Sequence, residues 1–344
     1  MNHPIAPIPC KPWTLNGLSD RLIVSHYENN YGGAIRSLNA TREQLATLDL
    51  ALASGDEVRA LKEEELSAAG SVALHELYFG NLGPGSSGYF GDGKMPDAVC
   101  AALADQFGSV AAWRREFVAL AKALGARSGW VLLCPSRSDG RLSNQIVFDH
   151  AQAPIDAVPV LALDMYEHAY YPDFGANATA YVDAFMRNID WACVVERMAA
   201  VRANRPLPSS DRANSNLPSI GVEELAIQMA NGTPVQVLDA RPRHYFSKAV
   251  DMMKGAVWRD PERVDEWVGK LALELPVAVY CAYGFHVGCS VTAALREHGF
   301  DAQFVRGGLS AWYAIGGARG LPATDELDAR PSLIAPERLT IARS

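Results

Sequence analysis

The chain has 344 residues, of which 49% are hydrophobic and 20% are charged, and its formal net charge at pH 7 is −8. This composition is typical of globular proteins and excludes disorder over the whole length. The negative charge opposes non-specific binding to nucleic acid and to anionic membranes, and no apolar run is long enough to predict a membrane-spanning helix. The length predicts two or three domains.

Six cysteines are scattered along the chain without a C-x-x-C pair, which excludes a zinc ribbon and a thioredoxin motif. Scattered cysteines in a chain of this length fit a reducing compartment better than a disulfide framework. The first residues lack the charged and apolar regions of a secretory signal. We therefore expect the protein in the cytoplasm.

The clearest linker is residues 204–216, a stretch dominated by Pro, Ser, Asn, Asp and Arg that cannot bury an apolar face. It separates a first domain at residues 1–203 from a second at residues 217–322. Residues 323–344 form a polar tail that we expect to be loosely packed.

The first domain begins with helical patterns. Residues 18–54 carry apolar positions at helical spacing, with a capped helix start predicted at Thr41, and residues 109–125 predict another amphipathic helix. Short apolar runs at 130–134, 146–148 and 158–163 then predict strands. The fold class predicted for this domain is a helical hairpin followed by an α+β region.

In the second domain, strands and helices alternate. Apolar runs at 235–239, 277–281 and 302–305 are separated by helical patterns at 222–231 and 288–298. This alternation predicts an α/β fold with a parallel sheet and helices on both faces.

Three histidines of the first domain suggest a metal site. His26 and His75 lie in predicted helices, and His168 follows Asp164 by four residues. Three imidazoles and one carboxylate suit manganese or iron with a position open for substrate. From the residues alone, hydrogen-bonded core histidines remain the alternative.

The residues around these positions carry a resemblance. Asp164, Glu167 and His168 belong to the segment DMYEHAYY, and further matches are Phe107-Gly108-Ser109, Gly129-Trp130, Asn188-Ile189-Asp190-Trp191 and Asn39. Residues 10–198 thereby resemble the iron/manganese superoxide dismutase family. The resemblance implies dismutation by one metal ion per chain that cycles between +3 and +2, with iron favoured and manganese the alternative. The implied ligands are His26, His75, Asp164 and His168.

The chain departs from that family near the metal. The family usually has His and Tyr at the positions of Asn30 and Ala34, where they form the substrate gateway and proton relay. Tyr31, or else Tyr27, is the candidate to refill the gateway. His150 is the candidate to bond the metal-bound solvent, and the alternative is a surface histidine at a strand end.

Glu167 has two interpretations. It is either a solvated carboxylate at a helix end or, as the resemblance implies, a residue that reaches across a dimer to the partner's last histidine ligand. The intact motif favours the second interpretation and predicts a homodimer or a tetramer.

Cys281 ends an apolar run and precedes a loop with Gly284 and His286, after which a helical pattern begins. A thiol between a strand end and a helix N-terminus meets backbone N–H groups and a dipole that favour an anion. This setting predicts a nucleophilic thiol that can hold a persulfide. A buried structural cysteine is the alternative.

Residues 219–320 resemble a single rhodanese domain. The matching motifs are Asp239-Ala240-Arg241, Gly255-Ala256 and Gly307-Gly308-Leu309-Ser310-Ala311-Trp312. The resemblance implies Cys281 as the catalytic residue, and Gly284, His286 and Arg241 as substrate-binding residues, although most members have Arg where this chain has His286. Arg241 and Arg259 are candidates to anchor an oxyanion such as thiosulfate or chromate, and the alternative is that both are ordinary salt-bridge partners. The loop looks most like rhodanese-type proteins of chromate-resistance operons, which also encode iron superoxide dismutases.

These observations predict a superoxide dismutase joined to a sulfurtransferase-like or oxyanion-handling domain, acting in oxidative or chromate stress. Two alternatives remain open. The metal site could serve an iron enzyme that acts on sulfur species instead of superoxide, or the second domain could be a non-catalytic oxyanion or redox sensor.

Overall fold

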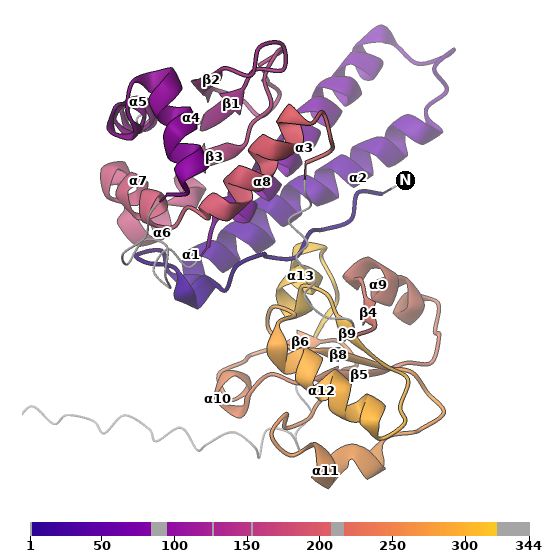
Figure 1. Cartoon of the computed structure of the whole chain (residues 1–344). Coiled ribbons are helices and arrows are strands. Elements are labelled where there is room, and N and C mark those ends of the chain that lie inside the picture. Colours follow the sequence, from indigo (N-terminus) through magenta and orange to yellow (C-terminus); the bar gives the residue numbers. More distant parts are fainter. Residues whose placement is uncertain (1, 84–94, 126, 153, 208–216, 322–344) are drawn as a thin grey trace, which may run out of the picture. The chain divides into compact units, whose positions relative to one another are not determined.

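The computed structural model describes residues 2–83, 95–125, 127–152, 154–207 and 217–321. Most of the predicted linker and the predicted polar tail lie outside these residues. The chain divides into two compact units (Figure 1). One contains residues 1–214 and 310–316, and the other contains residues 215–309 and 317–344.

The first unit begins with a helical hairpin. A short 3₁₀ turn is followed by one continuous helical rod and by a long returning helix: η1 (Pro12–Thr14), α1 (Asp20–Ser25), the π-helix η2 (His26–Tyr31), α2 (Gly32–Thr47) and α3 (Gly55–Asn81). Helices α2 and α3 run side by side (Figure 1). Ser19 and Ser54 cap α1 and α3 by accepting hydrogen bonds from the backbone N–H groups of Leu22 and Glu57.

The helix start predicted at Thr41 is wrong. Thr41 is buried inside α2, on the same face as Ile35 and Leu38. The apolar spacing therefore continues through this position, and packing against α3 holds the helix together despite its capping-type residues.

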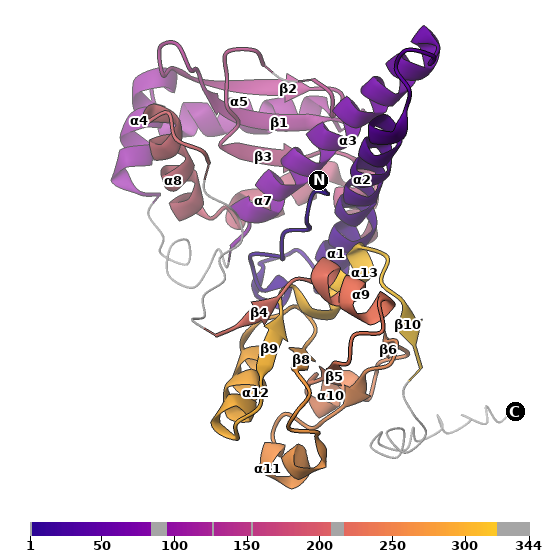
Figure 2. The ribbon, with the colours of Figure 1, turned by 90° about the vertical axis from the view of Figure 1, so that its right-hand side faces the viewer.

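A small sheet and six further helical segments complete the first unit: α4 (Asp97–Phe107), α5 (Val110–Ala123), β1 (Trp130–Pro135), β2 (Leu142–Val147), β3 (Leu161–Asp164), η3 (Glu167–Ala169), α6 (Tyr171–Phe174), α7 (Ala178–Arg187) and α8 (Trp191–Arg202). The sheet is antiparallel with the order β2-β1-β3 (Figure 2). Every residue of the central strand β1 is buried. Asp164 pairs with Trp130 in the register of β3 and β1, so the sheet places both side chains near the start of β1.

The second unit is built on a five-stranded parallel sheet with the order β4-β9-β8-β5-β7. Its elements are β4 (Ser219–Ile220), α9 (Val222–Ala230), β5 (Gln236–Asp239), α10 (Arg243–Phe246), β6 (Met252–Met253), β7 (Val257–Trp258), α11 (Val264–Trp267), η4 (Val268–Lys270), β8 (Val277–Tyr280), α12 (His286–Glu297), β9 (Ala302–Val305) and β10 (Arg319–Gly320). Helix α13 (Gly308–Ala314) follows β9, and its residues from 310 onward belong to the first unit. The predicted fold class is confirmed for both parts of the chain. The short strands β4, β6, β7 and β10 have two residues each, too few to show a period in the sequence.

The core of the second unit lies between this sheet and the helices α11 and α12. Leu238 and Val279 of the sheet pack with Trp267 of α11 and with Val291 and Leu295 of α12. Because the strands are parallel, the carboxyl ends of β5, β7 and β8 meet at one edge. Arg241, Arg259 and Cys281 follow these ends directly or within two residues.

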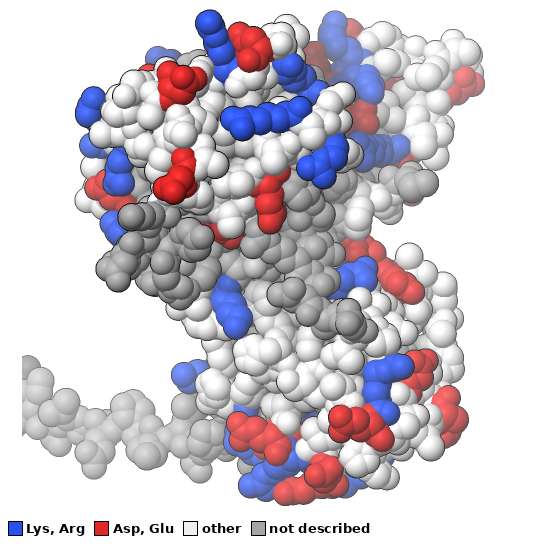
Figure 3. All heavy atoms as spheres, in the orientation of Figure 1, with Lys and Arg blue, Asp and Glu red and all other residues white. Residues whose placement is uncertain are grey.

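The surface carries charges of both signs. On the face that Figure 3 shows, acidic and basic side chains are interspersed over each unit. Among the described residues, no helix is both long enough and apolar enough to cross a membrane.

Candidate metal centre and candidate thiol site

Four side chains from four elements converge inside the first unit. They are His26 at the start of η2, His75 of α3, Asp164 at the end of β3 and His168 of η3, and their ligand atoms all lie within 4.8 Å of one another. The Nε2 atoms of His26, His75 and His168 lie 3.2, 3.8 and 3.1 Å from the same oxygen, Oδ2 of Asp164.

The burial of this group argues for a metal ion. Asp164 and His26 are fully buried and His75 is 1% exposed. The Nε2 atoms of His26 and His75 have no hydrogen-bond partner among the described residues. Buried polar atoms without partners are costly, and a cation at their meeting point would remove that cost. Imidazole nitrogen and carboxylate oxygen are suitable ligands for iron and manganese, so the four residues fit the predicted metal.

The protonation states also suit a metal. Burial lowers the pKa of His26, and it lowers the pKa of His75 to about 3. Burial alone would raise the pKa of Asp164, but the charge and hydrogen bond of His168 and the neighbouring His26 outweigh it and hold that pKa below its usual range. Neutral imidazoles and an ionised carboxylate are the forms that bind metal ions.

Backbone groups orient two of these side chains. Nδ1 of His75 donates to the carbonyl oxygen of Ser71 at 2.7 Å, which leaves the lone pair on Nε2 facing Asp164. The amide of Tyr166 donates to Oδ1 of Asp164 at 2.8 Å, so Oδ2 remains for the histidines.

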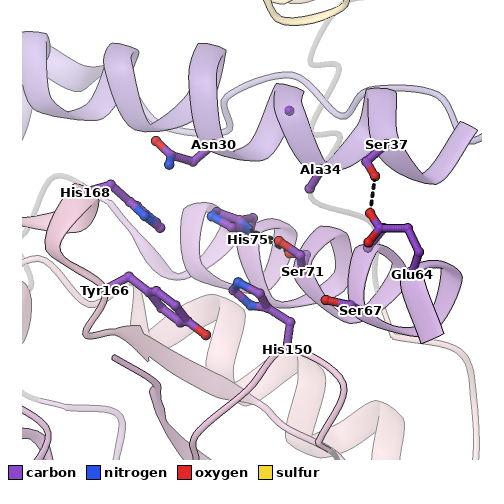
Figure 4. Close-up of a pocket in the computed structure, with 12 residues that line it drawn as sticks. Asn30, Ala34, Ser37, Glu64, Ser67, Ser71, His75, His150, Tyr166 and His168 are labelled. Carbon is purple, nitrogen blue, oxygen red and sulfur yellow. Dashed lines mark hydrogen bonds between the residues drawn. The ribbon is translucent and has the colours of Figure 1, made fainter. Parts of the chain in front are cut away.

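A cavity of about 360 Å³ leads to this group (Figure 4). His75, His168, Tyr166 and His150 surround one end, and Ser37 and Glu64, which are hydrogen-bonded to each other, lie at the other. Most of the remaining lining residues are small: Gly33, Ala34, Ser67, Ala68 and Ser71, together with Asn30.

His150 lies in this cavity wall. Its Nδ1 accepts a hydrogen bond from the indole Nε1 of Trp130 at 3.0 Å, and its ring stacks on Tyr166 with 4.7 Å between centroids. An indole N–H only donates, so Nδ1 carries no proton and the proton of neutral His150 is on Nε2. Gly70 of α3 lets the loop approach, because a Cβ at this position would lie 1.9 Å from the carbonyl oxygen of His150.

Tyr31 and Glu167 are placed differently. The Tyr31 ring contacts His75, but its hydroxyl donates to Glu76 at 2.8 Å and accepts from the amide of Ala6 at 2.9 Å. Tyr31 is not among the residues that line the cavity, and Tyr27 is not either. This geometry does not support the predicted gateway role. Glu167 is exposed in η3, next to His168, and its contact with a partner stays a prediction.

The structure places Cys281 in the second unit directly after β8 and before α12, which begins at His286. Cys281 is 5% exposed, and its carbonyl oxygen accepts a hydrogen bond from the amide of Leu309 at 2.9 Å. Gly284 adopts φ +73°, and a Cβ there would lie 2.5 Å from the amide nitrogen of Gly307. Position 284 therefore requires glycine, both for its positive φ and for the close approach of the Gly307 backbone.

Arg241 forms an ion pair inside the second unit. Its guanidinium forms a bidentate ion pair with Asp239, with Nε 3.0 Å from Oδ1 and Nη2 2.6 Å from Oδ2, and it also donates to the carbonyl oxygen of Asp251. The Tyr280 hydroxyl donates to the same carboxylate at 3.0 Å. These contacts support the alternative interpretation of Arg241 as a salt-bridge partner, and its role in substrate binding stays a prediction. His286 is exposed at the first position of α12.

Sequence reasoning missed three contributors to these sites. Trp130 orients His150, Gly70 admits the loop, and Glu76 receives the Tyr31 hydroxyl. Each acts through a tertiary contact between separate elements, and no local sequence pattern predicts such a contact.

Comparison with known proteins agrees with this geometry. Residues 95–197 match the C-terminal domain of iron/manganese superoxide dismutases, and residues 222–315 match the rhodanese-like domain. "Superoxide dismutase [Fe]" of Cupriavidus metallidurans is 52% identical over 200 residues, which is 58% of this chain and 98% of the relative. "Superoxide dismutase [Fe]" of Aquifex aeolicus is 35% identical over 193 residues, covering 54% of this chain and 87% of the relative.

A manganese enzyme is among the relatives too. "Superoxide dismutase [Mn] 2" of Haloferax volcanii is 32% identical over 193 residues, covering 56% of this chain and 92% of the relative. The chain belongs to the iron/manganese superoxide dismutase family, and it carries a rhodanese-like domain after the dismutase part. Both family assignments made from the sequence are thereby confirmed.

Proposed function

We propose that the first unit dismutates superoxide, converting two superoxide ions and two protons to dioxygen and hydrogen peroxide. One observation carries the proposal: three imidazoles converge on one oxygen of the buried carboxylate of Asp164, at the end of a cavity. A bound iron or manganese ion would supply the one-electron redox chemistry. The family membership supports this activity, and the relative with 52% identity supports iron.

The protein's own groups have separate tasks in this proposal. His26, His75, Asp164 and His168 hold the ion. His150 holds a proton on Nε2, where it can donate a hydrogen bond to solvent or substrate in the cavity, because Trp130 occupies Nδ1. The reaction consumes two protons, so a donor at this place shortens their path.

The cavity wall sets access to the site. Asn30 and Ala34 line the cavity where larger side chains are usual in the family, so the route to the ligands is wide. A wide cavity admits superoxide readily but positions it less tightly. It also keeps open the alternative that the iron site acts on a larger sulfur species.

Replacing His150 tests its role. His150→Ala should lower the dismutation rate of metal-quantified protein by about tenfold or more, and His150→Gln, which keeps a donor, should lose less. His298→Ala is the matched control, because His298 lies in the second unit, where its half-exposed side chain is 3.2 Å from Asp265. Equal rates for wild type and His150→Ala would remove His150 from the mechanism.

We further propose that the protein is a cytoplasmic homodimer or tetramer, with Glu167 at the subunit contact. The exposure of Glu167 beside His168 supports a contact with a partner. Light scattering should give at least a dimer for wild type and a smaller species for Glu167→Ala. A monomeric wild type would refute the assembly.

For the second unit, we propose sulfur transfer at Cys281. The thiolate would attack the outer sulfur of thiosulfate, so that a sulfur–sulfur bond forms at Cys281 while the sulfur–sulfur bond of thiosulfate breaks and sulfite leaves with the electron pair. Mass spectrometry should show a gain of one sulfur atom that Cys281→Ser abolishes. Cys289→Ser, half-buried in α12, is the matched control.

The absence of a persulfide with several sulfur donors would instead favour an oxyanion-binding or redox-sensing module.

We propose that the two units act together in oxidative stress, including chromate stress, in which thiols that reduce chromate generate superoxide. Deleting the gene should raise sensitivity to chromate. Unchanged sensitivity would remove the chromate role.

A further inference from the structure

The N-terminal segment is tied to the helices that carry two of the proposed metal ligands. Residues 3–6 are here called the N-terminal strap. Asn39 of α2 brackets the backbone of His3, accepting from its amide at 2.7 Å and donating to its carbonyl oxygen at 3.0 Å. These two hydrogen bonds anchor the strap to α2.

One carboxylate joins the strap to the hairpin. Oε1 of Glu76 accepts from the Tyr31 hydroxyl at 2.8 Å and lies 2.9 Å from Nε2 of His3. Ala6 adds two bonds, because its amide donates to the Tyr31 hydroxyl at 2.9 Å and its carbonyl oxygen accepts from the Tyr27 hydroxyl at 2.7 Å. Both tyrosine hydroxyls thus have a hydrogen-bond partner in the strap.

The two tyrosine rings form a wall beside the ligands. Tyr31 contacts His75 and Phe79, with 6.2 and 6.1 Å between ring centroids, and Tyr27 contacts Phe79 at 5.6 Å. Phe79 in turn contacts His26 at 5.0 Å. Tyr27 and Tyr31 are each 1% exposed, so this wall excludes water from the side of His75 that the cavity does not reach.

We propose that His3 and Glu76 are positioning residues that hold Tyr31 against His75 and thereby slow the release of the metal ion. The chain His3–Glu76–Tyr31–His75 links a half-buried ion pair to a buried ligand. This proposal rests on the proposed function only in taking His26, His75, Asp164 and His168 as the ligands.

A purely structural role makes a different prediction. The side chains of His3 and Glu76 are 34% and 29% exposed, and a pair of this kind contributes little to the stability of the fold. Removing it should leave the metal-free protein folded. If the pair acts on the ligand wall, its removal will raise the rate of metal release by more than any change in the unfolding of the metal-free protein explains.

The experiment measures release of iron from the full-length holoprotein to excess chelator. Glu76→Ala should release iron about tenfold faster than wild type, within the range that outer-sphere partners of metal ligands contribute. Glu76→Gln keeps an acceptor for Tyr31 and should stay within about twofold of wild type. Glu63→Ala is the matched control, because Glu63 lies on the same helix with a 74% exposed side chain.

Three further readings decide the outcome. The urea midpoint of the metal-free protein should be the same for wild type, Glu76→Gln and Glu63→Ala, and should fall in Glu76→Ala only by what the loss of one hydrogen bond to the Tyr31 hydroxyl explains. Hydrogen exchange of residues 27–31 should quicken in metal-free Glu76→Ala. The proposal is overturned if Glu76→Ala releases iron at the wild-type rate, or if Glu76→Gln releases iron as fast as Glu76→Ala. It is also overturned if the faster release is fully explained by a lower urea midpoint. If the wild-type protein takes up no metal, the proposed function is refuted at the loading step. In that case, unchanged hydrogen exchange of residues 27–31 in Glu76→Ala would separately refute the positioning role of His3 and Glu76.

Discussion

A single methyl group added at Gly70 should displace His150. The Cβ of Gly70→Ala would lie 1.9 Å from the carbonyl oxygen of His150 and 2.8 Å from its carbonyl carbon. Both atoms belong to the backbone and cannot turn away as a side chain can. To restore a carbon–oxygen contact of about 3.3 Å, the loop must retreat from α3 by about 1.4 Å.

The energetic cost follows from that displacement. Overpacking of this kind destabilises proteins by about 1–3 kcal/mol, and the better helix propensity of Ala returns up to about 1 kcal/mol. We expect a net loss of about 1–2 kcal/mol in the free energy of unfolding of the first unit. A displacement of more than 1 Å at His150 should also lower the dismutation rate by about tenfold to a hundredfold.

Urea unfolding followed by tryptophan fluorescence and a dismutation assay on metal-quantified protein test both effects. The control is Gly55→Ala on the same helix, where a Cβ meets no atom within 4 Å. That variant should be unchanged or stabilised by about 0.5 kcal/mol. The reasoning is refuted if Gly70→Ala matches Gly55→Ala in both stability and rate.

Three other predictions concern the buried ion pair, the tautomer of His150 and the metal. Arg241→Ala should destabilise the second unit by about 3–5 kcal/mol, because it leaves the buried carboxylate of Asp239 without a cation. Arg243→Ala removes a half-exposed ion pair and should cost less than about 1 kcal/mol. Similar urea unfolding curves for the two variants would contradict this prediction. Trp130→Phe should remove the preference of His150 for the Nε2–H form, which nitrogen NMR of the ring can detect, and an unchanged tautomer would show that another group sets it. Stripping the metal with a chelator should lower the thermal midpoint of the first unit and leave that of the second unit in place, and a shift of both would show that the second unit also depends on the ion.

The four proposed ligands were predicted from the resemblance to the superoxide dismutase family. The residues alone left hydrogen-bonded core histidines as the alternative, although His168 and Asp164 share one short motif. Their convergence depends on the hairpin and on β3, which the sequence patterns also predicted. The strands β5, β8 and β9 were predictable from their apolar runs, of which β8 is continuous and β9, interrupted by Gln303, is the weakest.

The errors arose where a tertiary contact outweighs a local pattern. Thr41 has the residue type of a helix cap, but the burial of its face against α3 carries α2 through it. The resemblance to rhodanese domains made Arg241 a candidate to bind an oxyanion, with a salt-bridge partner as the alternative. The structure instead folds its guanidinium back onto Asp239, two residues earlier, at a site that is almost closed to solvent.

Tyr31 illustrates the same limit from the side of the metal. Its position in the sequence, next to Asn30, suggested the cavity, but the π-helix η2 and the partner groups Glu76 and Ala6 turn its hydroxyl elsewhere. A π-helix has no sequence signature that would have shown this rotation, although such helices are frequent at functional sites.

The central claim is that His26, His75, Asp164 and His168 form a redox-active metal site that dismutates superoxide. The most direct test is the dismutation rate of the full-length protein, loaded separately with iron and with manganese and normalised to bound metal, beside Asp164→Ala. We predict one ion per chain, a high rate with iron, and loss of both metal and activity in Asp164→Ala. One bound ion per chain with negligible dismutation under either metal would contradict the claim and direct attention to sulfur substrates.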